Sequence, residues 1–118
     1  MAEAGLFIGW GEVVRGREER ALEVFSETVG FYGRLQEEGR IDSFEPSLLQ
    51  PHGGDLAGFI LMRGSEEQMD AIQHDDEFQR HLTRASFIVD RLGVVPATLG
   101  ESVGRQMAMF EAEVAALV

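Results

Sequence analysis

Residues 6–14, LFIGWGEVV, have the alternation of a β-strand but carry apolar side chains on both faces. Leu6, Ile8 and Trp10 fall on one face, and Phe7 and Val13 fall on the other, together with two glycines. An antiparallel sheet usually leaves one of its faces to water. A chain that contains this strand must therefore fold so that both faces of its sheet are covered.

Three further strands and three helices are expected along the chain. Gly16 is the expected N-cap of the first helix, which starts at about Arg17 and stops at Gly39, and Ser65 opens the second with a capping box. The second helix is expected to run to Gly93, with a break near Asp75. The remaining expected elements are strands at residues 41–49, 56–63 and 94–100 and a C-terminal helix at about 102–117.

This order, β-α-β-β-α-β with an additional helix, is that of a ferredoxin-like α+β fold with a four-stranded antiparallel sheet. Proline cannot donate to a sheet ladder and is found at sheet edges. Pro46 and Pro96 fall in the second and fourth strands, so the first and third strands are expected to be central. We found no internal linker or repeat, and residues 1–118 are interpreted as one domain.

Composition argues against several classes of function. The net charge of -11 would repel a phosphate backbone, so a nucleic-acid partner is not expected. The chain has no cysteine, no apolar run near the ~20 residues of a membrane span and no basic signal segment, which together favour the cytoplasm. Neither phosphate-loop nor dinucleotide-binding glycine spacing is present, and no cofactor is expected.

The stretch SEEQMDAIQHDDEFQRH, residues 65–81, resembles the second helix of the dimeric α+β barrel superfamily. It is most similar to antibiotic biosynthesis monooxygenase-type and YCII-related proteins, in which a short helical segment is followed by an acid or proline and then by a phenylalanine on a resumed helix. That phenylalanine is Phe78 here. The aspartate of the YCII-type His-Asp pair can match Asp75 or Asp76, but the histidine that would precede it near the first strand is absent.

The resemblance implies a subunit that pairs sheet to sheet with a second copy. It also implies a pocket in each subunit, between sheet and helices, that holds a small organic molecule. Some members of the superfamily oxygenate phenolic or quinone-like compounds without a cofactor, and others are isomerases or degradative enzymes. Fold alone does not choose among these activities.

Within residues 73–81, QHDDEFQRH, the best candidate for chemistry is His81. His74 and His81 are seven residues apart, or ~10 Å along a helix, which is too far for one metal ion. No metal site is therefore expected. His81 lies at the edge of the face that Phe78 begins, where it can be a catalytic base or a half-buried histidine paired with Glu77.

Four aromatic residues are candidates for ligand binding: Trp10, Tyr32, Phe59 and Phe78. Trp10 and Tyr32 combine an apolar body with a hydrogen-bonding group, which is typical of side chains that orient an aromatic ligand. Gly9 and Gly11 remove side-chain volume from one face of a central strand and can leave space for such a ligand beside Phe7 and Phe59. A β-bulge or close backbone packing is the alternative for the two glycines. The alternative is that these aromatic residues belong to the core.

The second face of the sheet can be covered by a second copy of the chain, which is favoured, or by the C-terminal helix. That helix carries a one-sided apolar stripe, with Val103, Met107, Phe110, Val114 and Leu117 spaced by 4, 3, 4 and 3 residues. The favoured function is a homodimer with a small apolar or aromatic ligand in each subunit. The alternatives are a cofactor-independent monooxygenase in which His81 accepts a proton, and a protein whose C-terminal helix docks another protein.

Overall fold

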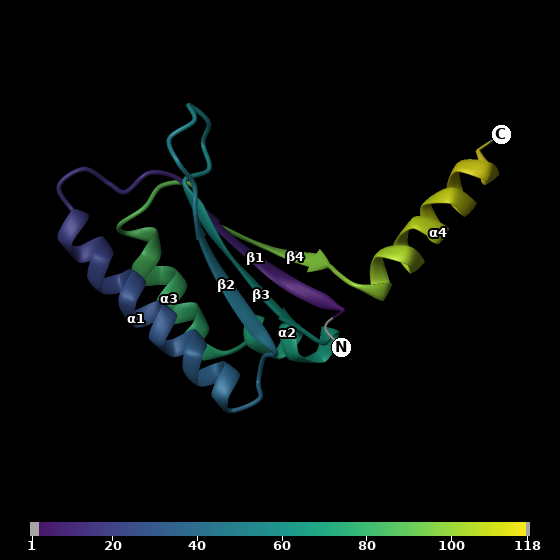
Figure 1. Ribbon diagram of the computed structural model, residues 1–118, viewed down its shortest axis with the longest axis horizontal. Coiled ribbons are helices and arrows are strands. Elements are labelled where there is room, and N and C mark those ends of the chain that lie inside the picture. The colour runs from purple at the N-terminus through teal and green to yellow at the C-terminus, as the bar shows by residue number, and fades with distance from the viewer. Residues whose placement is uncertain (1–2, 118) are drawn as a thin grey trace.

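The computed structural model describes residues 3–117 as a four-stranded antiparallel sheet with helices (Figure 1). The predicted ferredoxin-like α+β fold is confirmed. The strands lie in the order β2-β3-β1-β4, so the two proline-free strands are central, as predicted. The elements are β1 (Ala4–Trp10), α1 (Glu18–Glu37), β2 (Ser43–Leu48), β3 (Gly58–Gly64), α2 (Glu66–Gln73), α3 (Asp76–Ser86), β4 (Gly93–Thr98) and α4 (Glu101–Ala116).

The ends of the helices follow local sequence signals, with two corrections. The N-cap of α1 is Arg17 rather than Gly16, which adopts a left-handed φ of 91° just before the helix. The helix after the break ends at Ser86, not at Gly93. There the chain turns inward, buries Ile88 and Val89, and forms a β-bridge between Val89 and Val13, which a continued helix would not allow.

The predicted break between α2 and α3 is present, and it is built by capping. Ser65 and Gln68 form the predicted capping box at the start of α2. Asp75 starts α3 by accepting a hydrogen bond from the Phe78 backbone N–H at 3.0 Å, and it also pairs with Arg40 at 2.8 Å. The second cap fixes the direction of α3 and thereby the position of His81 one turn after Phe78.

The main core lies between the sheet and α1, α2 and α3. Leu6, Ile8, Ile60 and Met62 project from β1 and β3 onto Tyr32, Phe78 and their neighbours. A second, smaller cluster joins Ala21 and Val24 of α1 to Ile88 and Val89 after α3, and Trp10 packs against both clusters. The core is therefore divided into two parts, with Trp10 between them.

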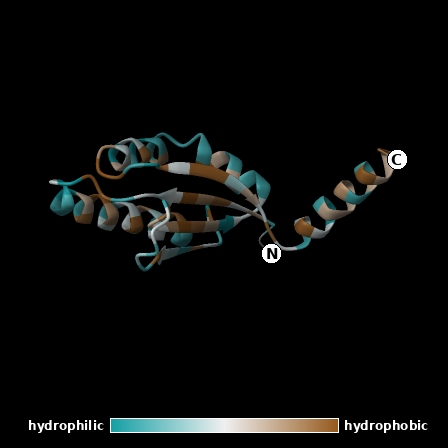
Figure 2. Cartoon of the chain, turned by 90° about the horizontal axis from the view of Figure 1, so that it is seen from above, coloured by the Kyte–Doolittle hydropathy of each residue, from teal (hydrophilic) through white to brown (hydrophobic). Residues whose placement is uncertain are grey.

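Within residues 3–117, no helix covers the opposite face of the sheet (Figures 1 and 2). Phe7 and Phe59 stack on this face with ring centroids 5.0 Å apart, and Val95 is 56% exposed. A Cβ atom at Gly9 would lie 2.7 Å from the Phe7 ring, so that ring takes up the room that glycine leaves. Within the subunit Gly9 therefore opens no space for a ligand, and Phe59 as a ligand residue stays a prediction.

The C-terminal helix α4 extends away from the rest of the chain (Figures 1 and 2). Of its side chains only Ser102 is buried. Near the start of the helix, Arg105 Nη2 lies 3.7 Å from Glu3 Oε2. Beyond these contacts its apolar stripe is exposed, with Phe110 at 62% and Met107 at 51%. Within one subunit α4 thus covers neither the open sheet face nor α1.

Candidate functional site

A cavity of about 420 Å³ lies between the sheet and helices α1 and α3. This volume falls in the range of small-molecule sites, which is about 300–1,000 Å³. Its wall draws on both core clusters and on the turn after α3. Its lining includes Trp10, Leu22, Thr28, Tyr32, His81 and Ala85.

The lining is almost entirely apolar, with a few polar groups. Leu22 is 72% exposed and therefore stands at the open side of the cavity. Polar side-chain atoms of the wall come from Thr28 and Tyr32 of α1 and from His81 of α3. An apolar cavity with a few polar groups on its wall suits an organic molecule that has an apolar body and one polar substituent.

Trp10 and Tyr32, two of the predicted ligand residues, both line this cavity. Trp10 meets the Phe25 ring edge-on, with centroids 6.1 Å apart. Tyr32 is 1% exposed, and burial raises the pKa of its phenol well above the usual range, so the hydroxyl stays protonated. The Tyr32 hydroxyl can therefore donate a hydrogen bond but cannot serve as a base near neutral pH.

Phe78 and Phe59 occupy other positions. Phe78 is fully buried beside the cavity, where it stacks against Tyr32 at 6.1 Å without lining the wall. Phe59 lies on the opposite face of the sheet, against Phe7. The structure thus brings Trp10, Tyr32 and His81 together, places Phe78 behind them, and separates Phe59 from them by the thickness of the sheet.

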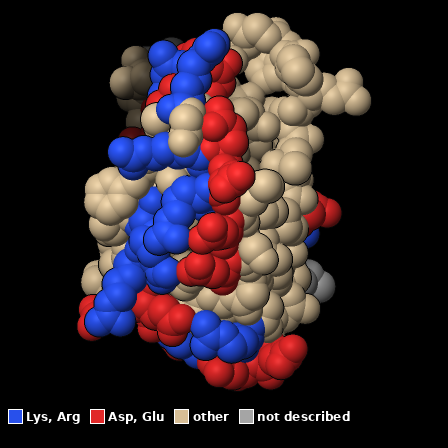
Figure 3. Space-filling model, turned by 90° about the vertical axis from the view of Figure 1, so that its left-hand side faces the viewer, with Lys and Arg blue, Asp and Glu red and all other residues tan. Residues whose placement is uncertain are grey.

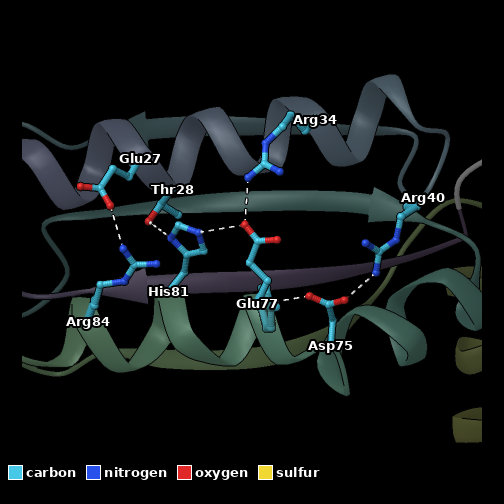
Figure 4. Close-up of polar contacts among 9 residues, drawn as sticks. Glu27, Thr28, Arg34, Arg40, Asp75, Glu77, His81 and Arg84 are labelled. Carbon is cyan, nitrogen blue, oxygen red and sulfur yellow. Dashed lines mark hydrogen bonds and ion pairs between the residues drawn. The ribbon is translucent and has the colours of Figure 1, made fainter.

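His81 is 5% exposed and reaches the cavity from the middle of α3. Its Nδ1 lies 3.2 Å from Thr28 Oγ1, and its Nε2 lies 3.8 Å from Glu77 Oε2 (Figure 4). Burial, assisted by the nearby Arg84, lowers the pKa of the imidazole below its ordinary value. The ring is therefore neutral at neutral pH, which is the form that accepts a proton.

Ion pairs between α1 and α3 surround the outer side of His81 (Figure 4). Arg34 donates to Glu77 Oε2 at 2.8 Å, and Arg84 donates to Glu27 at 2.7 Å. The hydrogen bond from Arg34 holds the pKa of the Glu77 carboxyl below its usual range. Glu77 therefore remains a carboxylate beside the imidazole.

Sequence reasoning missed Thr28, Phe31 and Arg34. Thr28 and Tyr32 are four residues apart, so they share a helix face, and a polar residue within the apolar stripe of α1 was a usable signal. The Phe31 ring stacks on the His81 imidazole, and this contact joins residues far apart in the sequence, so no local pattern indicates it. The same holds for the pairing of Arg34 with Glu77.

Within residues 3–117 no group of three or more histidine, aspartate or glutamate side chains is arranged to hold a metal ion. In the same part of the chain, no helix combines the length and apolarity needed to cross a bilayer.

No protein-family model and no curated protein matches the sequence, but solved structures share its fold. A dimeric protein of unknown function with a ferredoxin-like fold from Bacteroides fragilis is 11% identical, with a TM-score of 0.60 over 81% of this chain and 96% of its own. SnoaB, a cofactor-independent oxygenase from Streptomyces nogalater, is 17% identical, with a TM-score of 0.54 over 84% and 95%.

A conserved protein from Methanosarcina mazei is 11% identical, with a TM-score of 0.55 over 83% of this chain and 94% of its own. These neighbours fit the resemblance to dimeric α+β barrel proteins that the sequence showed. At these identities the similarity is one of fold. The chain is accordingly an α+β protein with the ferredoxin-like fold.

Proposed function

We propose that the protein is a homodimer in which each subunit binds a small, largely apolar organic molecule between the sheet and helices α1 and α3. The main support is the cavity of about 420 Å³, whose apolar wall carries the Tyr32 hydroxyl and His81. Tyr32 is almost fully buried and lines this cavity, and its protonated phenol can donate a hydrogen bond to a ligand hydroxyl or carbonyl.

Calorimetric titration with 2-naphthol tests the ligand site. Ala85 lines the cavity from α3, so Ala85→Trp fills part of the volume and is expected to abolish binding. The matched control is Ala112→Trp on the exposed part of α4, which should bind like the wild type. Equal affinities of the Ala85→Trp variant and the wild type would rule out this cavity as the binding site.

The open sheet face supports the homodimer. Phe7, Phe59 and Val95 leave apolar surface without cover from the same chain, and a second copy would bury it. Phe59→Arg places a charge on this face and is expected to convert the dimer to monomer in analytical ultracentrifugation. Phe87→Arg, at the exposed end of α3, is the control and should leave the assembly unchanged. A Phe59→Arg variant that still sediments as a dimer would disprove this interface.

A second candidate function is cofactor-independent oxygenation with His81 as the proton acceptor. It is favoured by a neutral imidazole on the cavity wall and by the likeness in fold to SnoaB, a cofactor-independent oxygenase. Removal of a proton from a bound hydroquinone would give an electron-rich anion that reacts with O₂ more readily than the neutral molecule does.

An oxygen electrode with 1,4-dihydroxynaphthalene tests this activity above the protein-free rate. His81→Gln should reduce the protein-dependent rate by about a hundredfold, while 2-naphthol still binds. An unchanged rate would remove His81 from the mechanism. No rate above the protein-free background would argue against oxygenation of this substrate class and leave the binding proposal standing.

A further inference from the structure

His81 stands between the cavity and a second, shallow hollow at the surface. This hollow has a volume of about 380 Å³ and is lined by Glu27, Gly30, Phe31, Arg34, Glu77, His81 and Arg84. Among residues 3–117, His81 alone lines both spaces. On the side of the molecule that Figure 3 presents, basic and acidic side chains form adjacent bands. The imidazole thus belongs to a wall with an apolar cavity on one side and charged groups on the other.

The two ring nitrogens point toward different neighbours, Thr28 and Glu77 (Figure 4). Nδ1 lies 3.2 Å from the hydroxyl oxygen of Thr28, and Thr28 lines the cavity. Nε2 lies 3.8 Å from Glu77 Oε2, and Glu77 lines the surface hollow. Each nitrogen therefore has a polar neighbour that belongs to one space and not to the other.

The chemistry of the neighbours assigns the hydrogen atoms of the neutral ring. An ionised carboxylate attracts an N–H, so the Glu77 carboxylate, 3.8 Å from Nε2, favours the tautomer with its hydrogen on that nitrogen. In this tautomer Nδ1 has a free lone pair that can accept the hydrogen of the Thr28 hydroxyl. Arg34 keeps Glu77 ionised through its 2.8 Å hydrogen bond, and this stabilises the arrangement.

Packing holds the ring in this orientation. The imidazole stacks on Phe31 of α1 with centroids 4.7 Å apart and planes 9° from parallel. The charged groups that act on it come from both helices: Glu77 and Glu27 favour its protonated form, whereas Arg84 opposes it. The stack with Phe31 therefore constrains the orientation of the ring, while the surrounding charges act in opposite directions on its protonation.

From this geometry we infer that His81 is a proton relay through the cavity wall. The O–H bond of a bound ligand breaks, its proton moves to Thr28 Oγ1, and the hydroxyl proton of Thr28 forms the Nδ1–H bond. The Nε2–H bond breaks in turn and its proton passes to solvent water in the hollow, beside Glu77. The reverse sequence returns a proton to the cavity and restores the ring. The inference rests on the proposed ligand site.

Nitrogen NMR on the ligand-free protein tests the hydrogen assignment independently of any ligand. The neutral His81 ring should carry its hydrogen on Nε2, and a hydrogen on Nδ1 would overturn the relay. Glu77→Gln should lower the pKa of His81, because it removes the charge that favours the imidazolium. Glu23→Gln, an exposed carboxylate paired with Arg20, should leave the His81 pKa unchanged. A His81 pKa that Glu77→Gln does not move would also overturn the relay.

Temperature-jump relaxation with bound 4-nitrophenol tests the route itself, because the absorbance of this probe reports its ionisation. Thr28→Val keeps the shape of the side chain but removes its hydroxyl, and should slow ionisation of the bound probe by about tenfold or more. Thr83→Val is the matched control, because the Thr83 hydroxyl bonds only to Gln79 O on the exposed side of α3.

The outcomes separate the relay from the ligand site. Slower relaxation in Thr28→Val, with the amount of bound probe unchanged, supports the relay. Binding with equal relaxation rates in the wild type and Thr28→Val means that the proton leaves through the mouth of the cavity, and it overturns the relay while the ligand site stands. If 4-nitrophenol does not bind, the ligand site fails for phenols and the inference fails with it.

Discussion

The imidazole of His81 and the ring of Phe31 lie face to face, with centroids 4.7 Å apart. This stack joins α3 to α1 at the place where the apolar cavity meets the charged surface. Because this packing buries the imidazole, the pKa of His81 depends on how the two helices pack. Stability should therefore depend on pH in a range that His81 determines.

The free energy of unfolding should decrease as the pH falls below about 6.5, the ordinary pKa of histidine. The unfolded chain then binds a proton at residue 81, whereas the folded chain, in which the pKa of His81 is lowered, does not until more acidic pH. Urea unfolding at pH 7.5 and 5.5 measures the difference. His81→Gln should reduce it, and His74→Gln, whose side chain is exposed, should not.

Asp75→Ala should destabilise the fold by about 1 kcal/mol, because Asp75 caps α3 through the Phe78 N–H. Asp76→Ala, at the next position, removes a carboxylate that makes no side-chain hydrogen bond within the described part of the chain. Urea denaturation of both variants compares the loss of the capping hydrogen bond with the loss of a negative charge near the start of the helix. Equal losses would show that the charge near the helix start, and not the cap, stabilises α3.

Phe78→Ala should lower the free energy of unfolding by about 3–5 kcal/mol, because it leaves a cavity at a fully buried position beside Tyr32. Phe87→Ala, which truncates a ring that is 58% exposed, should change the unfolding free energy by about 0.5 kcal/mol or less. Chemical denaturation monitored by circular dichroism gives both values. A small effect of Phe78→Ala would mean that the two core clusters can close over the missing ring.

Truncation after Arg105 should leave the rest of the subunit folded. It keeps Ser102 and the contact of Arg105 with Glu3, and residues 106–117 of the segment that it removes are exposed in the subunit. Far-ultraviolet circular dichroism should lose only the helical signal of the deleted turns, and the unfolding midpoint should stay within a few degrees. An aggregated or unfolded product would show that α4 completes the core of another subunit.

The order of elements and the positions of the strands in the sheet were predictable, because they follow from local chemistry. Pro46 and Pro96 cannot donate to a ladder, and they do lie in the edge strands β2 and β4. The start of α3 at Asp75 was predictable for a similar reason, since an aspartate before an acidic turn is a cap.

The end of α3 and most of the site were not predictable from the sequence. Val89 continues the helical spacing of Leu82 and Ala85, which predicts a longer helix. In the structure it instead forms a β-bridge with Val13, a residue far from it in the sequence. The distance between Thr28 and His81 likewise depends on how two helices pack. The position of Phe59 could have been predicted, because strand alternation places Phe59 and Ile60 on opposite faces of the sheet.

Trp10 is the only tryptophan of the chain, and it forms part of the cavity wall at the junction of the two core clusters. All indole fluorescence of the unlabelled protein therefore originates at this one position. Entry of a molecule into the cavity changes the polarity around a single emitter, so the native chain reports its own occupancy without an attached dye or an engineered residue.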